Sequence, residues 1–156
     1  MIIVDFEKEH AEELYGGNLN DDKNRPAIQI STFSDEVVVK NLAFTGILDG
    51  KIIASGGIYP MWNGVGEAWF VGSNSILNHP ILITKTIKKY LTDLMNLNNF
   101  HRVQAFVRKD WNEAKRWIEV VGMQQEGIVR SFSPDGRDHI LSVSYTHLTL
   151  PTRLMV

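Results

Sequence analysis

The chain has 156 residues, of which 44% are hydrophobic and 22% are charged, and its formal net charge is −2. This length and composition predict one globular domain with its own core. The charge offers no broad attraction to nucleic acid or to an anionic membrane, and the absence of cysteine excludes disulfides, thiolate metal sites and a cysteine nucleophile. The N-terminus does not resemble a signal peptide and no apolar run reaches membrane-spanning length, so we expect a cytoplasmic protein.

The N-terminal third predicts a strand and a helix, followed by a segment that the sequence leaves open. Residues 2–6 read as a short strand, and residues 7–15 read as a helix that Gly16 and Gly17 end. The segment 27–41 is ambiguous, because its three consecutive valines fit either a strand or the last turn of a second helix.

The middle of the chain predicts an antiparallel meander of three strands. Two apolar runs, residues 43–48 and 51–59, are joined by Asp49-Gly50, and this two-residue connection favours a type I′ hairpin. Gly56 and Gly57 inside the second run indicate a bulge or a close backbone approach. After a turn, residues 67–72 supply the third strand.

The C-terminal half predicts alternating helices and strands. Apolar residues recur at helical spacing after Pro80, which suits a first helical position because its missing N–H is not needed there. Residues 100–107 read as a strand with apolar residues on both faces, as in a covered sheet. A short helix at 111–122 ends at Gly122, and two strands joined by the turn "SPDG" follow it.

The sequence of the tail indicates a different origin. Residues 143–152 read "VSYTHLTLPT", which matches without interruption the translation of a transposon-end sequencing adaptor. The alternative is a native terminal strand with a polar tail, but an uninterrupted match of this length favours the artefact. We therefore expect a single domain at 1–142 and a non-native tail at 143–156, and we exclude His147 and Arg153 as site candidates.

The order of elements resembles the Gcn5-related N-acetyltransferase (GNAT) family. The segment "VRKDWNEAKRWIEVVGM" looks like the family's fifth strand and last helix, and "EGIVRSFSPDGRDHIL" looks like its final hairpin. The "WFVGS" strand end and the Arg116-Trp117 pair are similar to small acetyltransferase-fold proteins of tailed bacteriophages, some of them enzymes and others internal virion proteins. The resemblance implies an α/β (α+β) fold with a mixed, mostly antiparallel central sheet and helices on both faces.

The resemblance also implies a reaction. Family members transfer an acetyl group from acetyl-CoA to a primary amine, so the expected partner is a small-molecule or protein amine acceptor. The alternative is a non-catalytic structural or interaction protein that associates with phage virion proteins. Nothing in the sequence identifies the acceptor.

The coenzyme site implied by the resemblance begins where the family's fourth strand parts from the fifth. Backbone groups left unpaired there bind the pantetheine, and the pyrophosphate lies at the start of the next helix, favoured by its dipole. The coenzyme-binding candidates are Trp69, Phe70, Val71, Gly72, Ser73, Ser75, Ile81, Leu82, Lys85 and Asn112.

The loop that should hold the phosphates departs from the family's pattern. Residues 73–79 contain no glycine, and residues with a Cβ resist the left-handed angles of a phosphate-cradling turn. The simpler interpretation is that Asn78 or His79 caps the helix. Lys85, with Lys88 and Lys89, fits a solvated helix face, although Lys85 could reach a phosphate.

The catalytic candidates are incomplete. Glu67 lies where many family members place a general-base glutamate, although the simpler interpretation is an exposed strand-end residue. Ile118 stands where the family's proton-donating tyrosine is found, and Trp111 stands at the usual asparagine position, with Asn112 one residue later. The histidines show no metal-ligand spacing, so we expect no metal site.

Overall fold

The computed structural model describes residues 1–15, 28–30 and 38–146. In chain order, its elements are β1 (Ile2–Asp5), α1 (Lys8–Tyr15), β2 (Ile28–Ile30), β3 (Ala43–Leu48), β4 (Lys51–Trp62), β5 (Val65–Gly72), the 3₁₀ helix η3 (Asn74–Asn78), α2 (Pro80–Leu97), β6 (Arg102–Arg108), α3 (Asn112–Val121), β7 (Gln124–Val129) and β8 (His139–Tyr145).

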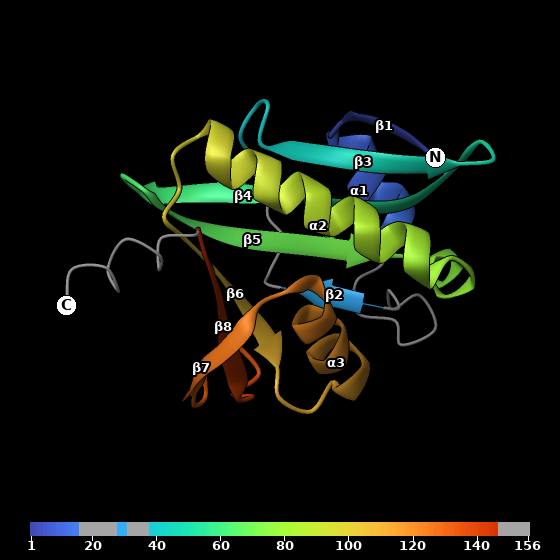
Figure 1. Ribbon diagram of the computed structural model, residues 1–156. Helices are drawn as coiled ribbons and strands as arrows, with labels where there is room; N and C mark the ends of the chain where they lie inside the picture. The colour runs from blue at the N-terminus through green and yellow to red at the C-terminus, as the bar shows by residue number, and fades with distance from the viewer. Residues whose placement is uncertain (16–27, 31–37, 147–156) are drawn as a thin grey trace. The chain divides into compact units, whose positions relative to one another are not determined.

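The strands form one eight-stranded sheet (Figure 1). Its order is β1-β3-β4-β5-β6-β8-β7, and β2 pairs with β5 off this path. The pairing of β5 with β6 is parallel, whereas β1–β3, β3–β4, β2–β5, β6–β8 and β7–β8 are antiparallel. The mixed, mostly antiparallel α/β fold expected from the sequence is confirmed.

The chain divides into two compact units, which are described separately below. Unit 1 comprises Met1–Tyr59 and Ala68–Ile83, and unit 2 comprises Pro60–Glu67 and Thr84–Val156. The strand β5 therefore gives its first three residues to unit 2 and its remaining five to unit 1.

In unit 1, the turn between β3 and β4 has the predicted form. Asp49 has φ 52° and Gly50 has φ 76°, and positive φ at both central residues is the mark of a type I′ turn. The strands pair directly on either side of it, Leu48 opposite Lys51. The Asp-Gly signal was therefore sufficient to fix this hairpin.

The two glycines of β4 serve a close approach rather than a bulge. A Cβ added to Gly57 would lie 2.4 Å from the Leu42 carbonyl oxygen and 2.8 Å from the Ala43 Cα. Only glycine allows the backbones to come so near. The register shift in this hairpin lies elsewhere in β4: Gly46 is opposite Ala54 and Ile47 is opposite Ile52, so Ile53 is the extra residue.

The helix α1 joins the core of unit 1 through one face. Ala11 and Leu14 are buried and cluster with Val71 of β5. Phe6 precedes the helix and packs edge-on against Trp69, with 5.2 Å between ring centroids. Burying these apolar surfaces is what holds the short helix, since eight residues are too few for a stable isolated helix.

A chain of three polar side chains crosses the same region. The Ser55 and Thr45 hydroxyls are 2.8 Å apart, and both residues are buried. Thr45 Oγ1 lies 2.8 Å from His10 Nδ1, and the Glu7 backbone N–H donates to the same nitrogen at 3.0 Å. These bonds satisfy the buried hydroxyls, which would otherwise destabilise the core.

In unit 2, β6 is the central strand, and its side chains alternate in burial. Val103, Ala105 and Val107 are at most 1% exposed, whereas the residues between them, Arg102 and Gln104 among them, are only partly buried. The strand lies inside the sheet, as the sequence predicts, but its two faces are buried to different degrees.

The helix α3 covers the buried face of unit 2. Ala114, Ile118 and Val121 are its buried residues. Gly122 ends the helix with φ 110°, and its N–H bonds back to the Glu119 carbonyl. This is the left-handed C-terminal cap that the sequence predicts.

The strand β8 continues into the segment that resembles an adaptor. Val143 is 1% exposed and lies between Gln104 of β6 and Gln124 of β7. Residues 143–145 therefore complete a paired strand, whatever their origin. The rest of this tail, from residue 147, lies outside the described residues.

The ambiguous segment 27–41 resolves in part. Residues 28–30 form β2, whereas Val38 and Val39 belong to neither a helix nor a strand. Val37 lies outside the described residues, so the choice between strand and helix is settled for two of the three valines only. No helix within the described ranges is long and apolar enough to cross a membrane.

Candidate functional site

The strand β5 changes its partner midway. Its first three residues pair in parallel with β6, Val65 opposite Arg102 and Glu67 opposite Gln104. The recorded pairing with β6 ends at Glu67. In unit 1 its last three residues pair antiparallel with β2, from Phe70 opposite Ile30 to Gly72 opposite Ile28.

The backbone direction shows which edge β2 takes. The Ser73 N–H donates to the Ile53 carbonyl of β4 at 2.9 Å. Because successive residues of a strand present their backbone groups to opposite edges, Gly72 and Phe70 turn theirs away from β4 and toward β2. The sequence predicted unpaired backbone groups over residues 69–72, and the structure differs because β2 occupies this edge.

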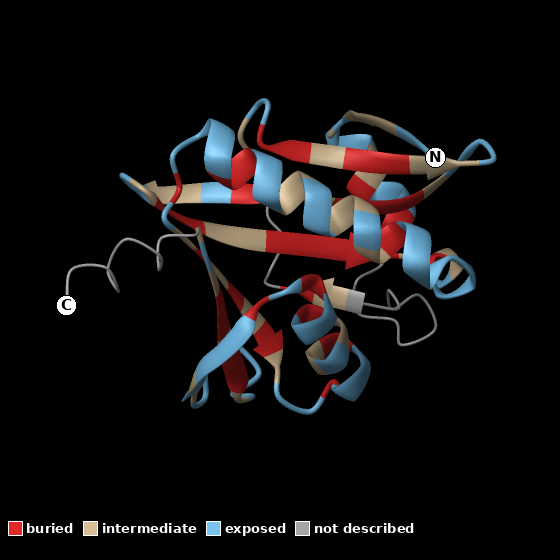
Figure 2. Ribbon diagram, in the orientation of Figure 1, coloured by how far each residue is buried: buried red, intermediate tan, exposed pale blue. Residues whose placement is uncertain are grey.

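The side chains of this part of β5 belong to the core (Figure 2). Trp69, Phe70 and Val71 are 4%, 5% and 1% exposed. A Cβ on Gly72 would lie 2.5 Å from the Ile76 Cδ1, so the missing side chain makes room for the buried Ile76 of η3. The side chains of this segment therefore offer a ligand little surface.

The loop after β5 is a 3₁₀ turn bonded to itself. The Ser75 N–H donates to Ser73 Oγ at 3.3 Å, the Ile76 N–H donates to the Ser73 carbonyl, and the His79 N–H donates to the Ile76 carbonyl. The Ser73 hydroxyl oxygen and the Ser75 backbone N–H, which belong to two candidates for phosphate contacts, are thus used within the turn. This is how the chain shapes the loop without glycine.

The start of α2 has the predicted proline and cap. Pro80 is the first helical residue, and the His79 carbonyl accepts the Ile83 N–H at 3.0 Å, as an N-terminal cap residue does. The candidates Ile81 and Leu82 have exposed side chains, 71% and 40% of their surface being accessible.

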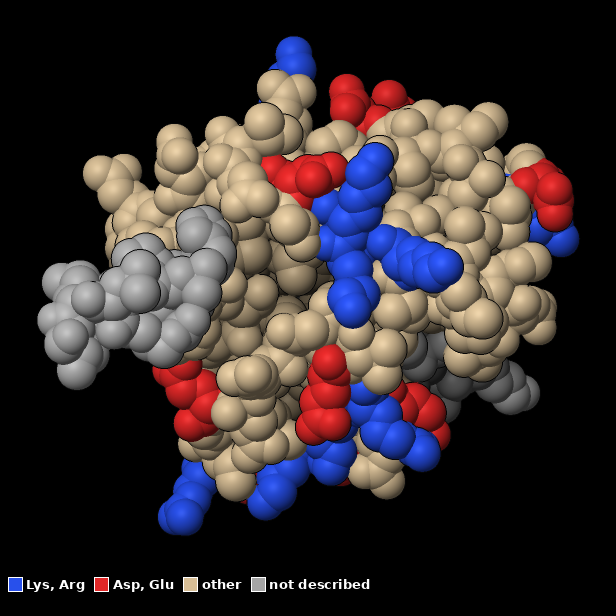
Figure 3. All heavy atoms as spheres, viewed as in Figure 1, with Lys and Arg blue, Asp and Glu red and all other residues tan. Residues whose placement is uncertain are grey.

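Three lysines of α2 are exposed. Lys85, Lys88 and Lys89 all lie on the solvent side of the helix, and Figure 3 shows basic side chains gathered over its middle. The solvated-face interpretation is therefore confirmed for these residues. Whether Lys85 also reaches a phosphate stays a prediction.

Glu67 occupies the end of the parallel ladder in unit 2. It is half-buried, and desolvation by burial raises the pKa of its carboxyl above the ordinary value of 4.5. Residues opposite each other in a parallel pair point to the same face, so Glu67 shares a face with Gln104. A carboxylate whose pKa is raised toward neutrality is a better proton acceptor at working pH.

Gln104 itself is held by its neighbours. Its Oε1 accepts bonds from Arg102 Nε and Nη2 at 3.2 and 3.1 Å, and its Nε2 donates to the Met61 Sδ at 3.4 Å. Arg102 in turn bonds Glu126 with both terminal nitrogens, at 2.9 and 3.0 Å.

Sequence reasoning missed this network. Tyr145 donates to Glu126 at 2.6 Å and accepts from Arg102 at 2.9 Å. These bonds raise the pKa of Arg102 and lower that of Glu126. The partners are up to 43 residues apart, so no local spacing could have indicated them.

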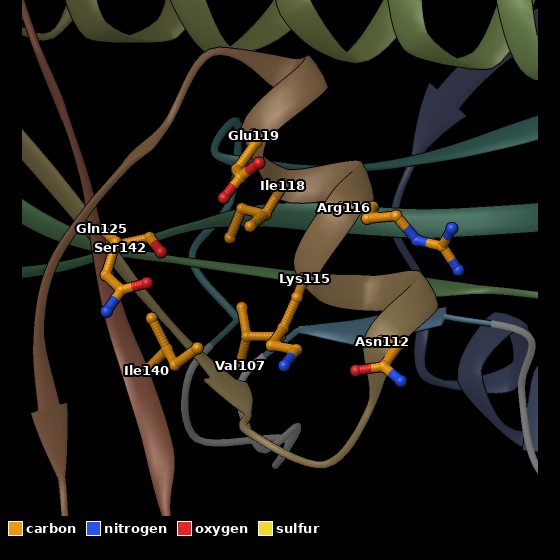
Figure 4. A pocket seen from close by; sticks show the side chains of 9 residues that line it. All are labelled: Val107, Asn112, Lys115, Arg116, Ile118, Glu119, Gln125, Ile140 and Ser142. Atoms are coloured by element: carbon orange, nitrogen blue, oxygen red, sulfur yellow. The ribbon is translucent and has the colours of Figure 1, made fainter.

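The family's acid position stays apolar. Ile118 is 4% exposed and Trp111 is 9% exposed, so neither offers an acidic proton to a leaving thiolate. Asn112, the candidate beside Trp111, is exposed and lines a cavity next to α3. Figure 4 shows its amide pointing downward from the first turn of the helix.

The predicted site residues are thus divided between the units. Eight of the coenzyme candidates, those between residues 69 and 82, belong to unit 1, whereas Lys85 and Asn112 belong to unit 2 together with Glu67. Among the described residues, no group of three histidine, aspartate or glutamate side chains could hold a metal ion.

No protein-family model and no curated protein sequence matches the chain. Solved structures do match. An acetyltransferase of the GNAT family from Bacillus anthracis aligns with a TM-score of 0.58 and 18% identity, over 66% of this chain and 65% of its own length. RimJ from Mycobacterium smegmatis, in complex with CoA-disulfide, aligns with a TM-score of 0.59 and 23% identity, over 70% of this chain and 54% of its own length.

A third match covers more of the chain. A chimera of the spermidine N-acetyltransferase SpeG from Vibrio cholerae aligns with a TM-score of 0.58 and 13% identity, over 88% of this chain and 75% of its own length. At these identities the likeness is one of fold. The chain therefore has the fold of the GNAT acetyltransferases.

Proposed function

We propose that the protein is an N-acetyltransferase that moves an acetyl group from acetyl-CoA to a primary amine. The observation that carries the proposal is Glu67, a half-buried carboxylate with a raised pKa at the residue where the parallel pairing of β5 and β6 ends. The GNAT fold supports it, and so does the RimJ structure that holds a coenzyme A derivative.

In the proposed reaction, Glu67 takes a proton from the ammonium form of the acceptor. The neutral amine then attacks the thioester carbonyl and a C–N bond forms. The nitrogen gives its second proton to water, the C–S bond breaks, and coenzyme A leaves as a thiolate. Ile118 cannot protonate the thiolate, so water does so, which is feasible because thiol pKa values lie near 8.5. A positioned base contributes about 10²–10⁴-fold to such a rate.

Acetyl-CoA must also form hydrogen bonds with the protein backbone. By the family resemblance, pantetheine amides bond to the edge of the strand corresponding to β5, and β2 occupies that edge at Phe70 and Gly72. Productive binding therefore includes displacement of β2, a strand of only three residues. We expect weak coenzyme binding for this reason.

Acetyl-CoA titration and a thiol-release assay with a panel of primary amines test the proposal. We expect saturable binding and release of free thiol, and loss of most of the rate in Glu67→Gln with coenzyme affinity retained. The matched control is Glu113→Gln, an exposed glutamate on α3. Absence of acetyl-CoA binding at millimolar concentration would refute the proposal that the protein is an acetyltransferase.

Two observations favour a second candidate, a non-catalytic structural or interaction protein of the phage virion type. The edge of β5 that would receive the coenzyme is already paired, and the acid position is Ile118. This candidate predicts indifference to acetyl-CoA and co-purification with virion proteins. Stabilisation by acetyl-CoA, together with absence from purified particles, would count against it.

A further inference from the structure

Unit 2 contains a cavity of about 450 Å³ beside α3. Its floor is apolar: Val107 of β6, Ile118 of α3 and Ile140 of β8 line it, and each is less than 10% exposed. This volume lies within the range of about 300–1,000 Å³ that small-molecule sites occupy. The floor can therefore receive a small apolar group.

Two side chains of opposite charge, Lys115 and Glu119, line the wall of the cavity (Figure 4). Lys115 points down toward Val107, and Glu119 points toward the strands β7 and β8, one helical turn further along α3. Within the described residues, no ion pair or hydrogen bond engages either side chain. Arg116 also lines the cavity, but its guanidinium points away from the other side chains.

Neutral polar groups complete the wall. Asn112, Gln125 and Ser142 contribute an amide, a second amide and a hydroxyl. None of these three side chains has a hydrogen-bond partner in the part of the chain that the structure describes. Ser142 is only 2% exposed as a residue, and it lines the cavity, where its hydroxyl can bond to a ligand.

The cavity is not the Glu67 site. Val107 follows Gln104 by three residues along β6, and side chains an odd number of residues apart on a strand point to opposite faces. Gln104 shares its face with Glu67. The cavity therefore lies on the other face of the sheet of unit 2, and a ligand bound there would not meet the proposed base.

We propose that this cavity binds a free α-amino acid with an aliphatic side chain, held as its zwitterion. The carboxylate bonds Lys115 and the ammonium bonds Glu119, two groups one helical turn apart on the same wall, and both charged groups of the ligand are attached to one carbon atom. The side chain lies on Val107, Ile118 and Ile140. A simple carboxylate or amine would leave one of the two wall charges unmatched.

Titration of the full chain with L-leucine, followed by calorimetry and by backbone amide NMR, tests this site. We expect millimolar binding with the largest shifts at residues 115–119 and 140–142. N-acetyl-L-leucine lacks the ammonium and L-leucinamide lacks the carboxylate, and each should bind about tenfold more weakly, as loss of one charged hydrogen bond predicts.

Variants assign each charge to its partner. Lys115→Met should weaken L-leucine about tenfold and make L-leucinamide its equal, and Glu119→Gln should do the same for N-acetyl-L-leucine. Lys89→Met and Glu113→Gln, exposed residues outside the cavity, are matched controls and should bind as the wild type does.

Three results would overturn the proposal. The first is no binding of L-leucine at about 10 mM, the order of affinity expected for so small a ligand. The others are that the wild type binds N-acetyl-L-leucine and L-leucinamide as tightly as L-leucine, or that both variants prefer L-leucine to these analogues as strongly as the wild type does. Far-ultraviolet circular dichroism melts show whether each variant is folded. The outcome does not depend on acetyl transfer, because no step of the assay involves acetyl-CoA.

Discussion

Glu67 lies opposite Gln104 in the last residue pair of the parallel β5–β6 ladder. The Gln104 amide is bonded to Arg102 and Met61. Burial desolvates the Glu67 carboxylate and raises its pKa. Its charge is therefore less favourable in the folded chain than in the unfolded chain.

The first prediction concerns stability and pH at this residue. A raised folded-state pKa means that Glu67 favours the folded state below about its ordinary pKa of 4.5, and that this contribution is lost as the pH rises through the folded value. Glu67→Gln should therefore raise the melting temperature at pH 7, by less than about 4 °C for a chain of this size.

Thermal melts of both proteins from pH 4 to pH 8 check this. The difference should shrink toward pH 4, where the carboxyl is protonated in both states. A difference that is constant across the range would mean that the amide acts through packing instead of through charge.

The second prediction concerns β2. Ile30 is 3% exposed and lies opposite Phe70, so Ile30→Pro removes both a side chain and a ladder N–H, whereas Ile30→Ala removes only the side chain. If coenzyme and β2 compete for the edge of β5, the proline variant should bind acetyl-CoA more tightly than the alanine variant.

Calorimetric titration of the two variants measures the difference, and we expect it to reach about tenfold if one backbone hydrogen bond is freed for the ligand. Equal affinities would show that β2 does not obstruct the coenzyme. Melting curves establish that both variants remain folded under the conditions of the titration.

The third prediction concerns the close approach at Gly57. Gly57→Ala places a methyl group against the backbone of Leu42 and Ala43, and overpacking of this kind destabilises by about 1–3 kcal/mol. Gly127→Ala is the control, because nothing lies within 4 Å of the added methyl group. Urea unfolding should show a lower free energy of unfolding for Gly57→Ala and a nearly unchanged one for Gly127→Ala.

The fourth prediction concerns acid stability at the end of β6. Hydrogen bonds from Arg108, and then from Arg137, lower the pKa of Asp110 to about 2. A lowered pKa gives stability above the ordinary value of 3.8 that is lost as the pH falls toward 2. Asp110 is 47% exposed, so the effect should stay below about 1 kcal/mol.

Asp110→Asn should therefore lower the unfolding free energy at pH 6 and leave it nearly unchanged at pH 2. Urea titrations at the two pH values measure this. An equal loss at both would assign the effect to the neutral hydrogen bonds that asparagine fails to reproduce.

Features set by neighbouring residues were predictable from the sequence. The Asp49-Gly50 turn, the start of α2 at Pro80 and the end of α3 at Gly122 each depend on a backbone angle that few residues adopt or that proline fixes. The meander and the order of the elements followed from these turn and helix-end residues and from hydrophobic periodicity.

Features that join distant segments were not predictable. The pairing of β2 with β5 depends on three residues, too few for a pattern. The desolvation of Glu67 depends on what packs around it, and the bonds of Arg102 to Glu126 and Tyr145 span separate strands. The candidate site could be located from the sequence, but the occupation of its edge could not.

The polar chain from Ser55 to His10 has one further consequence. A backbone N–H can only donate, so the bond from Glu7 requires a lone pair on His10 Nδ1. The imidazole is therefore restricted to the tautomer with hydrogen on Nε2, and the Thr45 hydroxyl must turn its hydrogen toward the ring, with Ser55 donating behind it. The Glu7 backbone N–H, just before α1, therefore sets the donor and acceptor roles of His10, Thr45 and Ser55.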